Sequence, residues 1–175
     1  MCNIINYYEP FGRTESFCMK IKTFNLRTLV PSLLLPAVVG GVGAIITNMG
    51  MPAFELLEKP PLVPPPWVFG VVWTILYLMM GYAAYLVKSS GCSIKPDALQ
   101  IYHIQLALNF LWVVVFFRLG QYWIAALVLA ALIAAIFITM RRFAECSTTA
   151  ARLLLPYLIW CCFALYLNIG IAILN

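Results

Sequence analysis

Charged side chains are scarce in this sequence of 175 residues, in which Asp, Glu, Lys and Arg together occupy only 10% of the positions. A soluble domain is about a quarter charged, so this chain lacks the polar surface that a water-exposed globule needs. Hydrophobic residues make up 64% of the chain, and the mean hydropathy is +0.96. The composition therefore predicts an integral membrane protein.

The residue types that build many enzyme and metal sites are also missing. His103 is the single histidine, and the six cysteines form no C-x-x-C pair, so no metal site is expected and the spacing gives no sign of a disulfide framework. All six carboxylates lie outside the apolar stretches described below, which leaves no paired acids for acid–base catalysis. These absences argue against an enzyme of ordinary mechanism, and no cofactor is required.

Five apolar stretches are long enough to cross a bilayer, which takes roughly 20 helical residues. We expect an all-α, integral membrane bundle of five transmembrane helices within residues 29–175, at about 29–47, 66–87, 98–117, 121–140 and 151–174. Residues 1–28 mix charges with aromatic residues and are predicted to form an N-terminal cytoplasmic tail. The connection at 48–66 holds six prolines, and a long, stiff connection of this kind is typical of a lid or binding loop.

The basic residues are distributed unequally between the two ends of the predicted helices. With the N-terminus inside, the outer segments carry only Lys59 and Arg118, and the other nine Lys and Arg residues fall on inner segments. An excess of Lys and Arg marks cytoplasmic loops, so we expect the N-terminus in the cytoplasm and the C-terminus outside. The basic residues form no basic helix face, so nucleic acid is not an expected partner.

Aromatic and amide side chains recur at helical spacing within the apolar stretches. Gln105, Asn109, Trp112 and Phe116 are four, three and four residues apart, which places them on one helix face. Comparable stripes are Gly70, Trp73, Tyr77, Gly81 and Tyr85, then Trp123, Ala126 and Ala130, and finally Trp160, Phe163, Ala164, Leu167 and Asn168. Two interpretations stay open: the residues pack helices together, or they line a cavity for a flat hydrophobic ligand. The first stretch adds Gly40, Gly41 and Gly43, a predicted helix–helix contact.

Three ordered blocks of residues cover about residues 35–175. They comprise Glu58-Lys59-Pro60 through Trp67-Val68-Phe69-Gly70 to Met80-Gly81-Tyr82, then Leu106-Ala107-Leu108-Asn109 with Trp112, and Leu155-Pro156-Tyr157-Leu158 through Leu167-Asn168. These blocks resemble the TspO/MBR family of tryptophan-rich sensory proteins and translocator proteins, once known as peripheral benzodiazepine receptors. The resemblance implies a five-helix bundle, usually a homodimer, which binds porphyrins, haem, sterol-like lipids and benzodiazepine-site ligands near the first loop.

Carried over by position, the resemblance adds to the stripes above and gives one set of predicted ligand-binding residues. They are Trp67, Trp73, Tyr77, Gln105, Asn109, Trp112, Phe116, Trp123, Ala126, Trp160, Phe163, Ala164, Leu167 and Asn168, with Phe54, Leu57, Pro60 and Leu62 on the lid loop.

The chain departs from the family pattern at three places. Ala53 and Leu62 stand where family members often have tryptophan, which argues against tryptophan-dependent degradation of porphyrin. Leu167, Ile169 and Ile173 stand where some members carry a sterol motif of Leu, Tyr and a basic residue, so sterol binding through that motif is not expected.

Three functions from different classes remain. The leading hypothesis is a membrane receptor or carrier that binds tetrapyrroles such as porphyrin or haem in a pocket under the first loop, with membrane lipid and a second copy of the chain as further partners. The alternatives are a light-dependent porphyrin-degrading enzyme and a structural or regulatory membrane partner without a small ligand.

Overall fold

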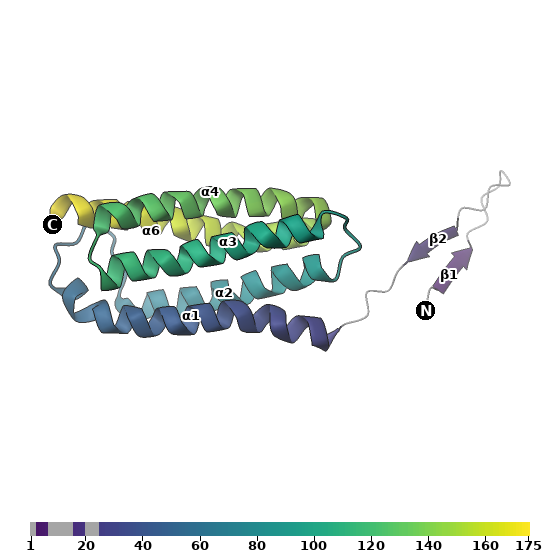
Figure 1. Cartoon of the computed structure of the whole chain (residues 1–175), viewed down its shortest axis with the longest axis horizontal. Coiled ribbons are helices and arrows are strands. Elements are labelled where there is room, and N and C mark those ends of the chain that lie inside the picture. The colour runs from purple at the N-terminus through teal and green to yellow at the C-terminus, as the bar shows by residue number, and fades with distance from the viewer. Residues whose placement is uncertain (1–2, 7–15, 20–24) are drawn as a thin grey trace.

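Five long helical segments lie side by side in the computed structural model (Figure 1), which describes residues 3–6, 16–19 and 25–175. Asn3–Asn6 (β1) and Ser16–Met19 (β2) pair as antiparallel strands. The prediction of a cytoplasmic tail at 1–28 falls in large part on residues outside the described ranges.

The helices follow one another up and down the bundle. They are α1 (Leu26–Glu55), α2 (Pro66–Lys88), α3 (Lys95–Val113) with the π-helical turn η1 (Val114–Arg118), α4 (Tyr122–Cys146), α5 (Thr148–Leu153) and α6 (Leu155–Leu174). Within the described residues, five segments have the length and apolar composition to cross a membrane, α3 with η1 forming the third and α5 with α6 the fifth. The predicted fold class, an all-α membrane bundle of five helices, is confirmed.

Local sequence explains where several helices begin. The Asn25 side chain accepts a hydrogen bond from the Arg27 amide at 3.0 Å and caps α1, as an N-cap asparagine does. Pro66 starts α2, and Pro156 lies in the first turn of α6, where the missing proline N–H costs no helical hydrogen bond. Proline thus both opens the second helix and separates α5 from α6.

The first helix is longer than the sequence predicts. It continues past residue 47 to Glu55 with Pro31, Pro36 and Pro52 inside it, so the connection to α2 shortens to residues 56–65. Proline is tolerated here because neighbouring groups in a membrane bundle satisfy the freed backbone carbonyls. Phe54, predicted on the lid loop, therefore lies in the last turn of α1.

Glycine allows α1 to approach its neighbours closely at two levels. A Cβ added to Gly81 would lie 2.9 Å from the Cα atom of Leu33, and one added to Gly40 would overlap the Tyr77 ring. Gly43 faces Val113, but Gly41 has no described atom within 4 Å of its Cβ position. The predicted glycine contact therefore exists at Gly40 and Gly43 and not at Gly41.

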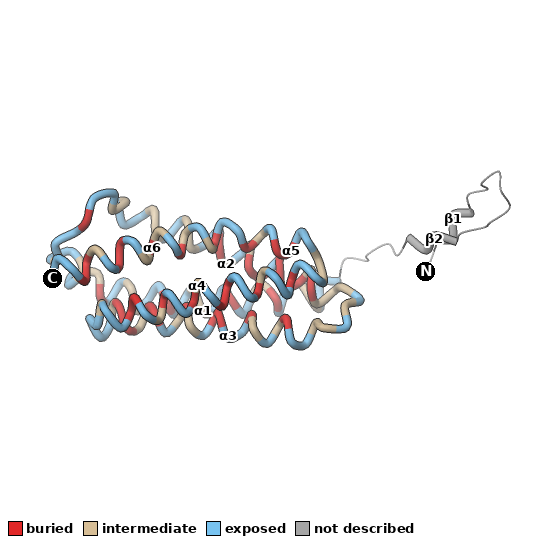
Figure 2. The backbone as a smooth tube through the Cα atoms, turned by 90° about the horizontal axis from the view of Figure 1, so that it is seen from above, coloured by how far each residue is buried: buried red, intermediate tan, exposed pale blue. Residues whose placement is uncertain are grey.

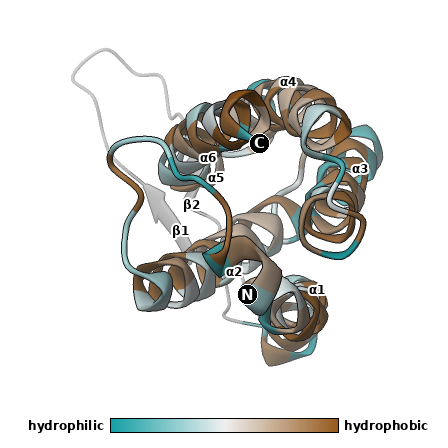
Figure 3. Ribbon diagram, turned by 90° about the vertical axis from the view of Figure 1, so that its left-hand side faces the viewer, coloured by the Kyte–Doolittle hydropathy of each residue, from teal (hydrophilic) through white to brown (hydrophobic). Residues whose placement is uncertain are grey.

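Buried residues face the interior along the bundle (Figure 2), while apolar residues also cover its outside (Figure 3). Met80, Tyr102, Leu129 and Tyr157 are fully buried. Only 17% of the most apolar window of α1 is buried, against 33–44% in the other four segments. The core is thus built mainly by α2, α3, α4 and α6, and α1 packs against it from one side.

One disulfide corrects the sequence-based expectation that none is indicated. Cys92, between α2 and α3, is bonded to Cys146 at the end of α4, with their Cα atoms 5.2 Å apart. The two cysteines are 54 residues apart in sequence, so only the folded bundle brings them together. We call this the disulfide end of the bundle, and the opposite end, where residues 56–65 connect α1 to α2, the loop end.

Candidate ligand-binding cavity

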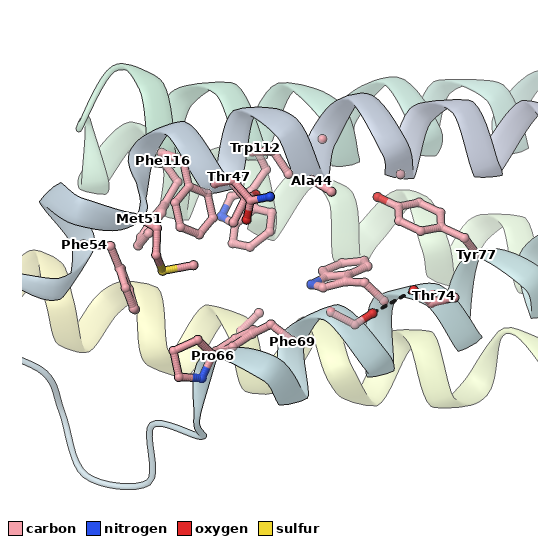
Figure 4. Close-up of a pocket in the computed structure, with 18 of the residues that line it drawn as sticks. Ala44, Thr47, Met51, Phe54, Pro66, Phe69, Thr74, Tyr77, Trp112 and Phe116 are labelled. Carbon is pink, nitrogen blue, oxygen red and sulfur yellow. Dashed lines mark hydrogen bonds between the residues drawn. The ribbon is translucent and has the colours of Figure 1, made fainter.

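A cavity of about 440 Å³ lies between α1, α2, α3 and α6 towards the loop end (Figure 4). Its volume falls within the range of small-molecule sites in proteins, about 300–1,000 Å³. Its lining residues are Ala37, Gly40, Gly41, Gly43, Ala44, Thr47, Asn48, Met51, Phe54, Val63, Pro66, Phe69, Gly70, Trp73, Thr74, Tyr77, Leu78, Trp112, Val113, Phe116, Phe117, Ala164, Leu167, Asn168 and Ile171.

Aromatic rings form much of the wall. The Trp73 ring lies 5.6 Å from Tyr77 and 6.1 Å from Trp112, measured between ring centroids. Phe116 continues the row at 5.9 Å from Trp112, and Phe54 lies 6.1 Å from Phe116 at the loop end. Such rings offer large, rigid apolar faces that suit a flat ligand.

A few polar groups fix the wall from behind. The indole N–H of Trp112 donates to the Asn168 side-chain oxygen at 3.1 Å, and the Asn168 amide donates to the Tyr122 carbonyl oxygen at 2.8 Å. The lining residues, all within the described part of the chain, include no Asp, Glu, Lys, Arg, His or Cys. The arrangement can bind and orient a hydrophobic molecule, but it presents no acid–base pair or thiol to it.

A buried chain of hydrogen bonds runs from the cavity wall into the core. The Tyr77 hydroxyl donates to Asn109 Oδ1 at 2.6 Å, and Asn109 Nδ2 donates to the Tyr157 hydroxyl at 3.2 Å. Tyr157 in turn donates to Gln105 Oε1 at 2.9 Å. Asn109 and Gln105 therefore lie behind the wall, where they link α2, α3 and α6 and do not border the cavity.

The α1–α2 loop is fastened to α6 by three contacts. The Glu58 backbone N–H donates to Asn175 Oδ1, and Asn175 Nδ2 donates to the Glu58 carbonyl oxygen, each at 3.0 Å. The Tyr166 hydroxyl donates to the Pro61 carbonyl oxygen at 3.1 Å. Pro60 packs on Gly170 so closely that an added Cβ would lie 2.7 Å from the proline ring. The loop thus covers the loop end of the bundle and is held there by its contacts with α6.

The predicted lid residues take different places. Pro60 is buried in the contact with α6, and Leu62 has a positive φ of 71° with a side chain that is 78% exposed. Leu57 lines a second cavity of about 210 Å³ next to the first, which also includes Arg118. Phe54 borders both cavities.

The structure brings about half of the predicted binding residues together. Eight of the predicted residues line the larger cavity, namely Phe54, Trp73, Tyr77, Trp112, Phe116, Ala164, Leu167 and Asn168. Trp160 and Phe163 form an outer layer, with the Trp160 ring 5.8 Å from Phe69. Ala126 is buried in the core away from the cavity.

Two predicted tryptophans point away from the cavity. Trp67 is 69% exposed and Trp123 is 60% exposed. Each is the second residue of its helix, α2 and α4, at the loop end of the bundle. Tryptophan is enriched where helices meet the membrane interface, and this accounts for the positions of both rings.

The sequence analysis missed the contribution of α1. Ala37, Gly41, Ala44 and Asn48 line the cavity and are four, three and four residues apart, so they share one helix face. The spacing was visible in the sequence. Small residues were interpreted only as packing contacts, whereas here their missing side-chain volume helps to form the cavity.

Known proteins resemble this chain over most of its length. A profile of the TspO/MBR family matches residues 32–174. The tryptophan-rich protein TspO of Archaeoglobus fulgidus is 37% identical over 152 residues, which is 86% of this chain and 99% of the relative. The translocator protein of Homo sapiens is 39% identical over 144 residues, 81% of this chain and 83% of the relative. With its five apolar helices, the chain is a multi-pass integral membrane protein that belongs to the TspO/MBR family.

Proposed function

We propose that the protein is a membrane receptor or carrier that binds tetrapyrroles, such as porphyrin or haem, in the cavity beside Trp112. One observation carries this proposal: an uncharged cavity of about 440 Å³ walled by Trp73, Trp112 and Phe116. Flat conjugated rings stack on or meet the edges of such side chains favourably. A tetrapyrrole fits this description, and the family to which the chain belongs makes that ligand class the first to test.

The cavity also weighs against the structural alternative. A partner protein without a small ligand needs helices that interdigitate fully, because an empty apolar space loses packing contacts. The glycine and alanine residues of α1 leave this space open where larger side chains would fill it. Binding is therefore the function that the geometry favours.

The test is a titration of the purified chain in nanodiscs with protoporphyrin IX, followed by quenching of tryptophan fluorescence. We expect saturable quenching, and we expect Ala164→Phe, which fills the cavity, to raise the Kd about tenfold or more. Ala130→Phe is the matched control, because Ala130 is exposed on α4 and should leave the Kd unchanged. Quenching that does not saturate, or that is equal in both variants, would reject the proposal.

The same samples test the alternative that the protein is a light-dependent porphyrin-degrading enzyme. Under illumination, the absorbance of bound porphyrin should decay no faster than in empty nanodiscs, because Ala53 and Leu62 replace tryptophan at the loop end. Faster decay that disappears in Ala164→Phe would assign the light-dependent activity to this cavity.

A further inference from the structure

The two sides of the cavity differ in how well they are enclosed. The lining residues on α3 and α6, among them Trp112, Val113 and Ala164, are at most 7% exposed, and Phe116 in η1 is 5% exposed. Several lining residues along α1 and α2, among them Gly41 and Thr74, are exposed, although Gly43 on α1 is buried. Residues on both sides border the same cavity, so the surface that they present to the cavity does not explain why their exposed fractions differ. The cavity wall is therefore incomplete on the side formed by α1 and α2.

Two stripes of lining residues, one on α1 and one on α2, border this side of the cavity, and Figure 4 shows one member of each, Ala44 and Thr74. Ala37, Gly41, Ala44 and Asn48 follow one face of α1, and Gly70, Thr74 and Leu78 follow one face of α2 at intervals of four residues. A Cβ added to either Gly41 or Gly70 would meet no described atom within 4 Å. From Gly41 to Asn48 the gap extends about 10 Å along the helix axis.

The gap has defined ends. Towards the disulfide end, α1 and α2 close on each other at Gly40 against Tyr77 and at Gly81 against Leu33. At the loop end, Gly50 of α1 packs against the backbone of Phe117 in η1. Contacts of α1 therefore lie on both sides of the opening, with α2 towards the disulfide end and with η1 at the loop end, and the opening lies within the apolar length of the bundle.

Access to the cavity from the aqueous phase is more restricted than access through the gap between α1 and α2. The loop over the cavity is tied to α6 through Asn175, Tyr166 and the packing of Pro60 on Gly170. A ligand that came from the aqueous side would have to break these contacts, and a ligand dissolved in the bilayer meets a gap whose borders include small residues such as Gly41, Ala44 and Gly70.

We infer that the gap between α1 and α2 is a lateral opening through which ligands dissolved in the bilayer reach the cavity. The inference rests on the proposed function, since it concerns how the same site is filled. It restricts the ligands to molecules that partition into membranes, and it makes their concentration per lipid, not per volume of water, the quantity that sets the rate of binding.

The test measures association and dissociation rates of protoporphyrin IX by stopped-flow fluorescence with the full chain in lipid vesicles. Gly41→Trp and Thr74→Trp place a large ring at the opening, and Leu127→Trp, on the exposed face of α4, is the matched control. We expect both opening variants to slow association by about tenfold or more and to slow dissociation as well, so that the two rates change more than the Kd does. The control should bind at the rate of the unmodified chain.

A second arm opens the lid. Tyr166→Phe combined with Asn175→Ala removes the hydrogen bonds that tie the loop to α6. We expect the association rate to stay the same in this variant and to fall when the amount of lipid is raised at constant total ligand.

Three results would overturn the inference. The first is a faster association in the lid variant together with normal rates in the opening variants. The second is a higher Kd in Gly41→Trp without slower association, and the third is loss of a dimer in Gly41→Trp, which would make the gap an interface between copies. If the unmodified chain binds no porphyrin at all, the proposed function fails, and that result is distinct from each of these.

Discussion

At the level of single residues, the wall of the cavity depends on hydrogen bonds that lie outside it. Tyr77 faces the cavity, but its hydroxyl donates into the core, to Asn109. Asn109 has no exposed surface and joins Tyr77 on α2 to Tyr157 on α6. In a membrane there is no water to replace such partners, so a buried amide both links helices and fixes the orientation of the ring it holds.

Asn109→Ala should therefore lower the stability of the bundle, because it removes both hydrogen bonds of this amide, each contributing about 0.6–2 kcal/mol between membrane helices. Thermal unfolding in detergent measures the effect. Tyr77→Phe removes one of the two bonds, so the double variant should lose less than the sum of the single changes. Asn48→Ala is the control, since Asn48 is exposed on α1. Equal melting temperatures for Asn109→Ala and Asn48→Ala would contradict this assignment.

At the level of helices, the course of α1 relative to α2 determines where the two helices pack together and where the cavity wall between them is incomplete. The two helices touch where glycine permits it, at Gly81 and Gly40, whereas a Cβ added to Gly41 would meet no described atom within 4 Å. The contact at Gly81 is with the backbone of α1, at Leu33 Cα and the Ser32 carbonyl oxygen, which cannot turn aside as a side chain can. Close approach of backbones at small residues is a general way in which membrane helices associate.

A matched pair of glycine substitutions tests this contact. Gly81→Ala should destabilise the bundle by about 1–3 kcal/mol, because the new methyl group forces α1 and α2 apart. Gly41→Ala should be neutral or stabilising by up to about 1 kcal/mol, because it enters open space and alanine favours the helix. Melting temperatures in one detergent compare the two. Equal losses in both variants would mean that the helices do not pack as described.

At the level of the whole molecule, the sequence predicted the bundle better than the cavity. Apolar length alone identifies five spans, because a bilayer imposes it. Apolar length does not show which face of a helix points into the bundle and which faces lipid, since both faces of a membrane helix are apolar. Trp112 and Trp123 therefore look equivalent in the sequence, although one lines the cavity and the other is exposed. The pairing of Cys92 with Cys146 was hidden for a related reason: it depends on which connections meet at one end.

The two ends of the bundle carry opposing indications about its orientation. Among the described residues, Arg27, Lys88, Lys95, Arg141, Arg142 and Arg152 lie at the disulfide end, against Lys59 and Arg118 at the loop end. This bias predicts that the disulfide end faces the cytoplasm, where thiols are normally kept reduced. Basic residues act while the helices insert, before Cys92 and Cys146 can meet, so the charge bias should prevail.

We therefore expect the loop end to face away from the cytoplasm, with Cys92 and Cys146 forming their bond only under oxidising conditions. Leu62→Cys, on the exposed loop, and Thr148→Cys, at the start of α5, report on the two ends once the native cysteines are replaced by serine. In bacterial spheroplasts, a membrane-impermeant maleimide should label Leu62→Cys at once and Thr148→Cys only after permeabilisation. The reverse pattern would place the disulfide on the oxidising side, where it would be a permanent link between the end of α4 and the α2–α3 connection.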